Sequence, residues 1–304
     1  MVKQATSAKE QIDILCRRGI EIDMEENEAE EILTDIGYFR LGFYCFPFET
    51  TYPNKKKRNH EYGKGTRFSN IVDLYYFNVD LSEILLRYIN SIEVNFRTNV
   101  VYRVSNKYKD CPTWFISPDI MQKDFVNTFE EKFYKQLKEN NSTIKDHHKK
   151  YLNDRYAPAW KTLEFLTFGT ILKIYKSLKD DGLQKEISLQ YGIKNPEYLI
   201  EYIRSIVEIR NICAHGGVLF DHSLRKSLSP KGVVNFGTSR NRSNLMCVIK
   251  IMMFLLAHMR QIKEYNFEDD IKNLFKRQKN NKSIFSIIKK CIGFDESNKK
   301  ILDI

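Results

Sequence analysis

The hexapeptide at residues 210–215, Arg-Asn-Ile-Cys-Ala-His, combines side chains that can act on a phosphodiester. Metal-independent RNA cleavage requires that the ribose 2′-hydroxyl lose a proton, that the leaving 5′-oxygen gain one, and that charge on the phosphoryl oxygens be neutralised. Imidazole exchanges protons near neutral pH, and a guanidinium stays charged and can bridge two phosphate oxygens. Arg210 and His215 are therefore candidate catalytic residues, and Asn211 could hold the imidazole or the phosphate in register.

The spacing of Arg210 and His215 is not rare, because about 0.3 such pairs arise by chance in a chain with this content of arginine and histidine. Their context is more specific. Apolar residues recur at helical spacing over residues 196–214, and Gly216 and Gly217 follow directly. Glycine ends a helix and lets a phosphate or another chain approach closely. The alternative is structural: Arg210 pairs with an acid and His215 only caps its helix.

Arg210 and His215 do not share one face of a regular helix, because five residues subtend about 140° beyond a full turn. One chain therefore offers half of a symmetric site. Two such helices that meet across a twofold axis would surround one phosphate with two arginines and two histidines. This arrangement predicts a homodimer.

The composition favours a folded, helical protein. The chain has 304 residues, and its 42% hydrophobic content excludes a wholly disordered chain. Only 13 glycines and 7 prolines argue against collagen and against a turn-rich all-β protein, so an all-α fold is expected. Lysine plus arginine outnumber aspartate plus glutamate by 49 to 39, and the net charge of +10 suits a polyanion such as nucleic acid. Charge alone does not distinguish RNA from DNA or anionic lipid.

Several patterns bear on the compartment. Residues 1–10 lack the apolar segment of a secretory signal. The most apolar stretch, residues 245–259, contains Lys250 and is shorter than the ~20 residues that cross a bilayer. The six cysteines form no Cys-x-x-Cys pair and are expected to be reduced thiols. The sequence therefore predicts a cytoplasmic protein with no metal, no cofactor and no membrane partner.

The helical pattern divides the chain into three segments. We expect an N-terminal helical segment over residues 1–66, a helical core over residues 67–262 and a basic, peripheral C-terminal tail with helical content over residues 263–304. A polar loop with four consecutive bases at residues 55–58 either contacts phosphate or is simply solvated.

Within the core, Asp80 and Glu83 form a capping-box pattern that predicts a fresh helix start at Leu81. The helix carries an apolar stripe with three- and four-residue spacing. Beside that stripe, Glu93 and Arg97 stand four residues apart and can form an ordinary intrahelical ion pair.

The chain also carries an ordered series of short motifs. They read RRGI at residues 17–20, IGYFRLGFY at 36–44, GTRF at 65–68, LYYF at 74–77, IEVNFR at 92–97, APAW at 157–160, FGT at 168–170 and RNICAH at 210–215. Together they resemble the Abi-like proteins of bacterial abortive-infection systems, of the AbiD/AbiF type, which belong to the HEPN superfamily. The resemblance extends over roughly residues 9–260, and the tail from residue 265 lies outside it.

The resemblance implies an all-helical HEPN bundle, usually dimeric, with an Arg-x(4–6)-His motif that forms a composite ribonuclease site without a metal. In this sequence the motif falls on Arg210 and His215, and the polar residue that often follows the arginine falls on Asn211. Glu93 and Arg97 match the family's Ile-Glu-x-x-x-Arg helix, which implies that they support the site or an interface. The sequence departs from many relatives at residues 216–219, Gly-Gly-Val-Leu, where a basic residue is expected.

The function implied is a toxin-like bacterial endoribonuclease that acts in phage defence by cutting RNA. Its resting activity requires control, by an antitoxin protein or a small RNA inhibitor. The alternative is a noncatalytic HEPN module that binds RNA or a partner protein through the same residues. A membrane-acting toxin is disfavoured because the sequence has no spanning segment.

Overall fold

The structure is a computed structural model that describes residues 4–237, 241–260 and 266–294. Helices dominate these residues, and the short strands β1 (Ile20–Glu21) and β2 (Thr66–Arg67) form one parallel pair. The expected all-α fold class is thereby confirmed. None of the described helices is both long enough and apolar enough to cross a membrane.

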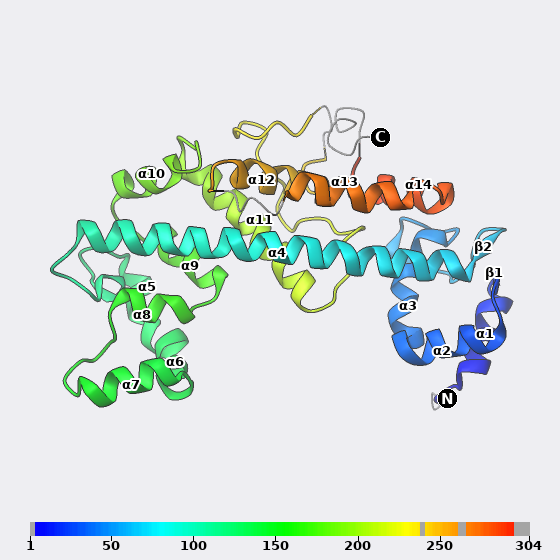
Figure 1. Cartoon of the computed structure of the whole chain (residues 1–304), viewed down its shortest axis with the longest axis horizontal. Coiled ribbons are helices and arrows are strands. Elements are labelled where there is room, and N and C mark those ends of the chain that lie inside the picture. Colours follow the sequence, from blue (N-terminus) through cyan, green and yellow to red (C-terminus); the bar gives the residue numbers. More distant parts are fainter. Residues whose placement is uncertain (1–3, 238–240, 261–265, 295–304) are drawn as a thin grey trace. The chain divides into compact units, whose positions relative to one another are not determined.

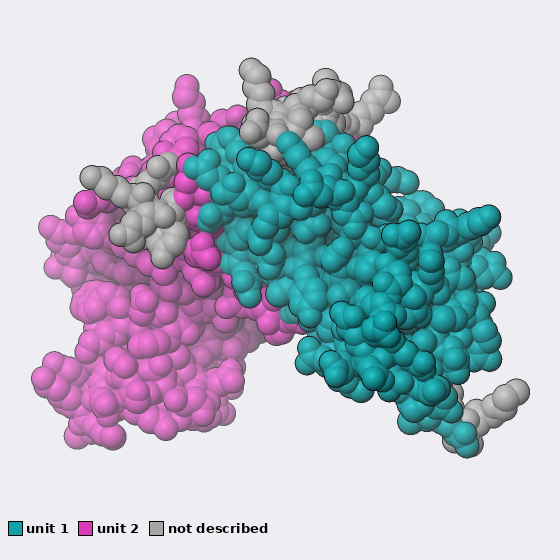
Figure 2. Space-filling model, turned by 45° about the vertical axis from the view of Figure 1, so that its right-hand side comes forward, with its two compact units in different colours: residues 1–84, 216–222, 268–304 teal, residues 85–215, 223–267 magenta. Residues whose placement is uncertain are grey.

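The chain folds into two compact units, which are coloured separately in Figure 2. Unit 1 comprises Met1–Ile84, Gly216–His222 and Glu268–Ile304, and unit 2 comprises Leu85–His215 and Ser223–Phe267. This division differs from the three consecutive segments expected with boundaries at residues 66 and 262, because each unit is assembled from separate stretches of the chain.

The helix α4 (Phe68–Lys107) runs unbroken for 40 residues and contributes its first part to unit 1 and the rest to unit 2 (Figure 1). The predicted helix start at Leu81 is wrong. Asp80 forms an ion pair with Arg277 at 3.4 Å, and Leu81 is fully buried inside the helix. The predicted apolar stripe is confirmed by the buried residues Leu81, Leu85, Tyr88, Ile92, Phe96 and Val100.

Unit 1 contains the N-terminal helices. They are α1 (Ala8–Arg17), α2 (Glu26–Ile32), a π-helical turn (Leu33–Gly37), α3 (Tyr38–Cys45) and two 3-10 turns (Phe46–Phe48 and Lys55–Lys57). A capping box starts α1, because the Ser7 side chain accepts a bond from the Glu10 backbone and the Glu10 carboxylate accepts one from the Ser7 backbone.

The C-terminal helices α13 (Phe267–Gln278) and α14 (Lys282–Ile292) are not peripheral. Each buries an apolar face, and Phe275 of α13 contacts Phe77 of α4 with ring centroids 5.5 Å apart. The tail expected over residues 263–304 therefore contributes core side chains to unit 1, whereas its residues 263–265 and 295–304 lie outside the described residues.

Unit 2 contains the second part of α4 and the helices that follow it. They are a 3-10 turn (Trp114–Ile116), α5 (Lys123–Phe129), a π-helical turn (Glu130–Tyr134), α6 (Lys135–Asn140), α7 (Ser142–Lys150), α8 (Ala159–Thr162), a 3-10 turn (Leu163–Phe165), α9 (Phe168–Lys176), α10 (Asp181–Leu189), α11 (Pro196–Ala214) and α12 (Leu245–Ala257). The helix α11 packs against α9, α10 and α12. It is therefore the central support of the predicted site.

Candidate functional site

The helix α11 has the boundaries that the sequence predicts. Its N-cap Asn195 accepts a bond from the Glu197 backbone, and Pro196 occupies the first helical position. At the other end, His215 is the C-cap and Gly216 takes a φ of 62°, a left-handed conformation that suits glycine and ends the helix. Local residues at both ends thus place Arg210 and His215 in and just after the last turn.

Tertiary contacts hold α11 along its length. A Cβ on Gly169 of α9 would lie 3.6 Å from Val207, so the two helices approach to ordinary contact distance. The Glu201 carboxylate accepts a hydrogen bond from the Ser229 backbone at 2.6 Å, and the Tyr202 hydroxyl accepts one from the Val234 backbone at 3.2 Å. The end of α11 is therefore fixed on unit 2 by a packed helix on one side and a bonded loop on another.

The three predicted site residues are accessible at this helix end. Arg210 is half-buried, and Asn211 and His215 are exposed. The Arg210 guanidinium reaches the Asn211 side-chain oxygen at 3.5 Å, and the His215 backbone N–H donates to the Asn211 carbonyl at 3.2 Å. Within the described residues, no carboxylate pairs with Arg210, and the His215 imidazole has no hydrogen-bond partner. A guanidinium and an imidazole are thus available to an incoming anion.

Glu93 and Arg97 lie elsewhere in unit 2, on α4, and form the ion pair that their spacing predicts. Arg97 is only 8% exposed; its Nη2 donates to Glu93 at 2.7 Å and to the Leu166 carbonyl at 3.0 Å. Leu166 directly precedes the N-cap of α9, the helix that packs on α11. Arg97 therefore connects α4 to the start of α9. It acts on α11 only indirectly, through the packing of α9 against α11.

The glycines after His215 belong to unit 1, where two side chains hold them. Arg40 of α3 donates to the Gly216 carbonyl at 3.0 Å, and a Cβ on Gly216 would lie 3.2 Å from the Arg40 guanidinium. Asn78 of α4 donates to the Gly217 carbonyl at 3.2 Å and accepts from the Leu219 backbone at 2.7 Å. Sequence reasoning missed both residues, although Arg40 stands in one of the ordered motifs.

The basic run at residues 55–58 is partly structural. Lys55 pairs with Asp221 at 3.0 Å, and Arg58 pairs with the buried carboxylate of Glu49. Lys56 and Lys57 are exposed and have no carboxylate partner among the residues described.

Metal-ligating side chains and cysteines bear on the chemistry that the chain can support. Across the part of the chain that the structure describes, no three His, Cys, Asp or Glu side chains gather as a metal site would require. All six cysteines fall in this part, and none of them forms a disulfide.

Comparison with known proteins decides the family. A family model described as Abi-like protein matches residues 31–221, which is more than half of the chain. The chain belongs to the Abi-like protein family. Neither the curated proteins nor the solved structures contain a match to it. The matched span is narrower than the resemblance expected over residues 9–260, but it includes Glu93, Arg97, Arg210 and His215.

Membership in the Abi-like family associates the chain with abortive infection. The matched residues also contain Arg40 and Asn78, the two side chains that hold the segment after the motif. The tail helices α13 and α14 fall outside the Abi-like match.

Proposed function

We propose that this Abi-like protein is a metal-independent endoribonuclease with a HEPN-type composite site. The observation that carries the proposal is the end of α11, where Arg210 and His215 are accessible and, among the described residues, free of carboxylate partners. A cation held by an acid would have to give up that bond before it could grip a phosphate.

The reaction assigned to this site needs no water, metal or redox partner. The ribose 2′-oxygen attacks the adjacent phosphorus, the bond from phosphorus to the 5′-oxygen breaks, and the products are a 2′,3′-cyclic phosphate and a 5′-hydroxyl. One proton leaves the 2′-hydroxyl and one reaches the 5′-oxygen. His215 is the C-cap of α11, and we assign it the role of acid or electrostatic stabiliser.

Arg210 and Asn211 complete one half of the site. The guanidinium neutralises the charge that gathers on the phosphoryl oxygens, which is worth most where the group is positioned in advance. Asn211 lies between Arg210 and His215 in the sequence, and its amide orients the imidazole or the phosphate.

We include a homodimer in the proposal, because Arg210 and His215 of one chain do not share a helix face and make half of a site. A single chain offers one imidazole at the end of α11, whereas a mechanism with a separate base for the 2′-hydroxyl and a separate acid for the 5′-oxygen needs two groups. Two α11 ends related by a twofold axis provide a base and an acid together. Sedimentation analysis is expected to give a dimer, and a strictly monomeric active enzyme would contradict the composite site.

In the cell we assign the protein a toxin-like role: it cuts RNA on phage infection, and an antitoxin protein or a small RNA restrains it beforehand. With a net charge of +10, binding of an RNA substrate or an RNA inhibitor through phosphates should weaken as salt is raised.

The test uses purified full-length protein and single-stranded RNA or tRNA in excess EDTA. Cleavage should leave a 2′,3′-cyclic phosphate and spare a substrate with a 2′-deoxy sugar at the cut. His215→Ala should abolish cleavage with an unchanged circular dichroism melt. Cleavage retained in His215→Ala would place the chemistry elsewhere, and RNA binding without any cleavage by the parent protein would make the chain a noncatalytic binding module.

A further inference from the structure

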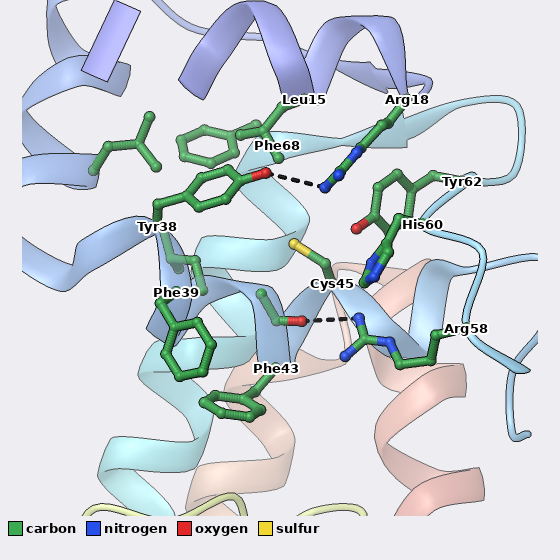
Figure 3. Close-up of a pocket in the computed structure, with 13 residues that line it drawn as sticks. Leu15, Arg18, Tyr38, Phe39, Phe43, Cys45, Arg58, His60, Tyr62 and Phe68 are labelled. Carbon is green, nitrogen blue, oxygen red and sulfur yellow. Dashed lines mark hydrogen bonds between the residues drawn. The ribbon is translucent and has the colours of Figure 1, made fainter. Parts of the chain in front are cut away.

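Unit 1 contains a pocket of about 150 Å³, shown in Figure 3, that has no part in the proposed cleavage chemistry. It lies between the end of α1, the helix α3, the start of α4 and the loop at residues 58–62. An apolar cavity of about this size holds one benzene molecule. The pocket therefore has room for one six-membered planar ring.

One side of the pocket is aromatic and neutral. Tyr38 and Phe43 of α3 and Phe68 of α4 line it, and the buried thiol of Cys45 points into its centre (Figure 3). Burial raises the pKa of Cys45 to about 12, so the thiol stays protonated at neutral pH. On this side a flat uncharged ring would meet aromatic rings and a neutral thiol.

The aromatic surface continues to the outside of α3. Phe39 is 80% exposed and Phe43 is 47% exposed, and their rings meet edge to face with centroids 5.3 Å apart. An exposed pair of phenylalanines at the mouth of a pocket is an apolar surface that favours a stacking partner.

Cations line the opposite side of the pocket. Arg18, Arg58 and His60 contribute to it, and no carboxylate is among the lining residues. Arg18 donates to the Tyr38 hydroxyl at 3.0 Å and has no carboxylate partner among the residues described. His60 has a φ of 57°, a left-handed conformation uncommon outside glycine, and its ring lies 3.3 Å from Glu49.

Arg58 and Glu49 form the support beneath this side. Arg58 donates to Glu49 and to the Gly42 carbonyl of α3, at 3.2 Å for the carbonyl. These bonds fix the loop on α3. Among the lining arginines, Arg18 is the one without an acid partner in the described part of the chain. Beyond Arg58, the run at residues 55–58 provides Lys56 and Lys57, both exposed.

We propose that this pocket receives one unpaired pyrimidine base of a single-stranded RNA, with the base against the α3 aromatic rings and its phosphate beside Arg18. Unpaired bases are recognised by stacking on aromatic rings and arginine planes, with basic side chains along the backbone. An apolar peptide side chain would fit the interior but would make no use of the cations. The choice of RNA as the polymer rests on the proposed function. The fit of the pocket to a flat ring beside a phosphate rests on the pocket residues alone.

The first experiment locates the base. Full-length His215→Ala protein, which should not cut its ligand, is irradiated with a single-stranded RNA of mixed sequence that carries 4-thiouridine, and cross-linked peptides are identified by mass spectrometry. We expect cross-links within residues 38–45 or 58–62. Cross-links found only in other peptides, or none at all, would overturn the proposal.

The second experiment separates stacking from simple apolar contact. In the same background, Phe43→Leu keeps most of the apolar volume but removes the aromatic face, so the dissociation constant for the RNA should rise about ten-fold. Tyr76→Leu is the matched control, because Tyr76 is 49% exposed on α4 in the same unit and does not line the pocket. Equal affinity of Phe43→Leu and the parent would overturn the proposal, and Phe39→Leu repeats the test on a more exposed ring.

Two further measurements distinguish an RNA strand from a free nucleotide, and the base site from the proposed nuclease. Uridine monophosphate that binds as tightly as the strand would overturn the proposal and make the pocket a site for a free nucleotide. Cleavage is measured separately with His215 intact. Cross-links in the pocket without cleavage would support the base site and contradict the proposed nuclease, whereas cleavage with unchanged affinity in Phe43→Leu would do the reverse.

Discussion

The middle of α4 and the end of α11 each carry an arginine that its sequence pattern marks, and the two side chains have opposite surroundings. Arg97 is buried and donates to Glu93 and to the Leu166 carbonyl. Arg210 is half-buried, reaches only toward Asn211 at 3.5 Å, and has no acid partner among the described residues. A buried arginine that is paired with an acid stabilises the fold, whereas an accessible arginine without an acid partner can bind a phosphate.

Arg58 of unit 1 is a second arginine that is paired with an acid. It bonds the buried Glu49 carboxylate and stacks over Phe46 with its guanidinium carbon 4.7 Å from the ring centroid. The comparison thus predicts that mutations at Arg97 and Arg58 affect stability, and that mutations at Arg210 affect activity.

The largest effect is expected from Arg210→Ala. Loss of a positioned charge at the phosphate should reduce kcat/KM for RNA cleavage by about 10³-fold. Arg210→Lys should lose less, because it keeps the charge but not the fork-shaped donor set. The melting temperature should stay unchanged in both variants. If Arg210→Ala were destabilised but cleaved RNA normally per folded molecule, Arg210 would have the same structural role as Arg97, and the comparison would be wrong.

Arg97→Ala should give the largest loss of stability. Removal of the arginine leaves Glu93 uncompensated in a mostly buried site, which should lower the free energy of unfolding of the full chain by about 3 kcal/mol. Denaturant unfolding measures this change. Arg155→Ala is the control, since the Arg155 side chain is 72% exposed and its loss should matter little. A stable Arg97→Ala protein without activity would instead place Arg97 in the site.

Asn211→Ala should have an intermediate effect on activity. The amide contributes one hydrogen bond to the imidazole or the phosphate, so kcat/KM should fall about ten-fold. Because Asn211 is exposed, its loss should leave the melt unchanged. No change in cleavage rate would remove Asn211 from the site and leave Arg210 and His215 alone.

The smallest effect concerns the pairing of Arg58 in unit 1. Burial tends to raise the pKa of Glu49, but the hydrogen bonds and charge of Arg58 outweigh it, so the pKa lies below its ordinary value of 4.5. A carboxyl whose pKa is lower in the folded protein than in the unfolded chain stabilises the fold at pH values above its unfolded-state pKa. That contribution is lost as the pH falls through the folded-state pKa.

The melting temperature of the parent should therefore drop more steeply below about pH 4.5 than that of Glu49→Gln. Parallel pH profiles for the two proteins would show that the Arg58 bond does not stabilise the charged form of Glu49.

Several features could be predicted because they depend on residues within one helical turn. Asn195 and Pro196 start α11 and Gly216 ends it, and all three are visible in the sequence. Glu93 and Arg97 meet because residues four apart share a helix face. The exposed position of His215 follows from its place at the end of that helix.

Local signals also misled where tertiary packing overrode them. Asp80 and Glu83 match a capping box, yet α4 continues through them because its apolar stripe is buried along the whole length. The tail is basic in composition, yet α13 and α14 bury their apolar sides in unit 1.

By itself, the sequence determined the all-α class, the limits of α11 and the identity of the residues at its end. Only the tertiary structure decided that Arg97 is enclosed while Arg210 is open, and that Arg40 holds Gly216 from 176 residues away. The physical reason is the distance along the sequence over which each interaction acts. Backbone hydrogen bonds and side-chain spacing in a helix depend on the next few residues, whereas the burial of a charge depends on which distant apolar surfaces cover one another.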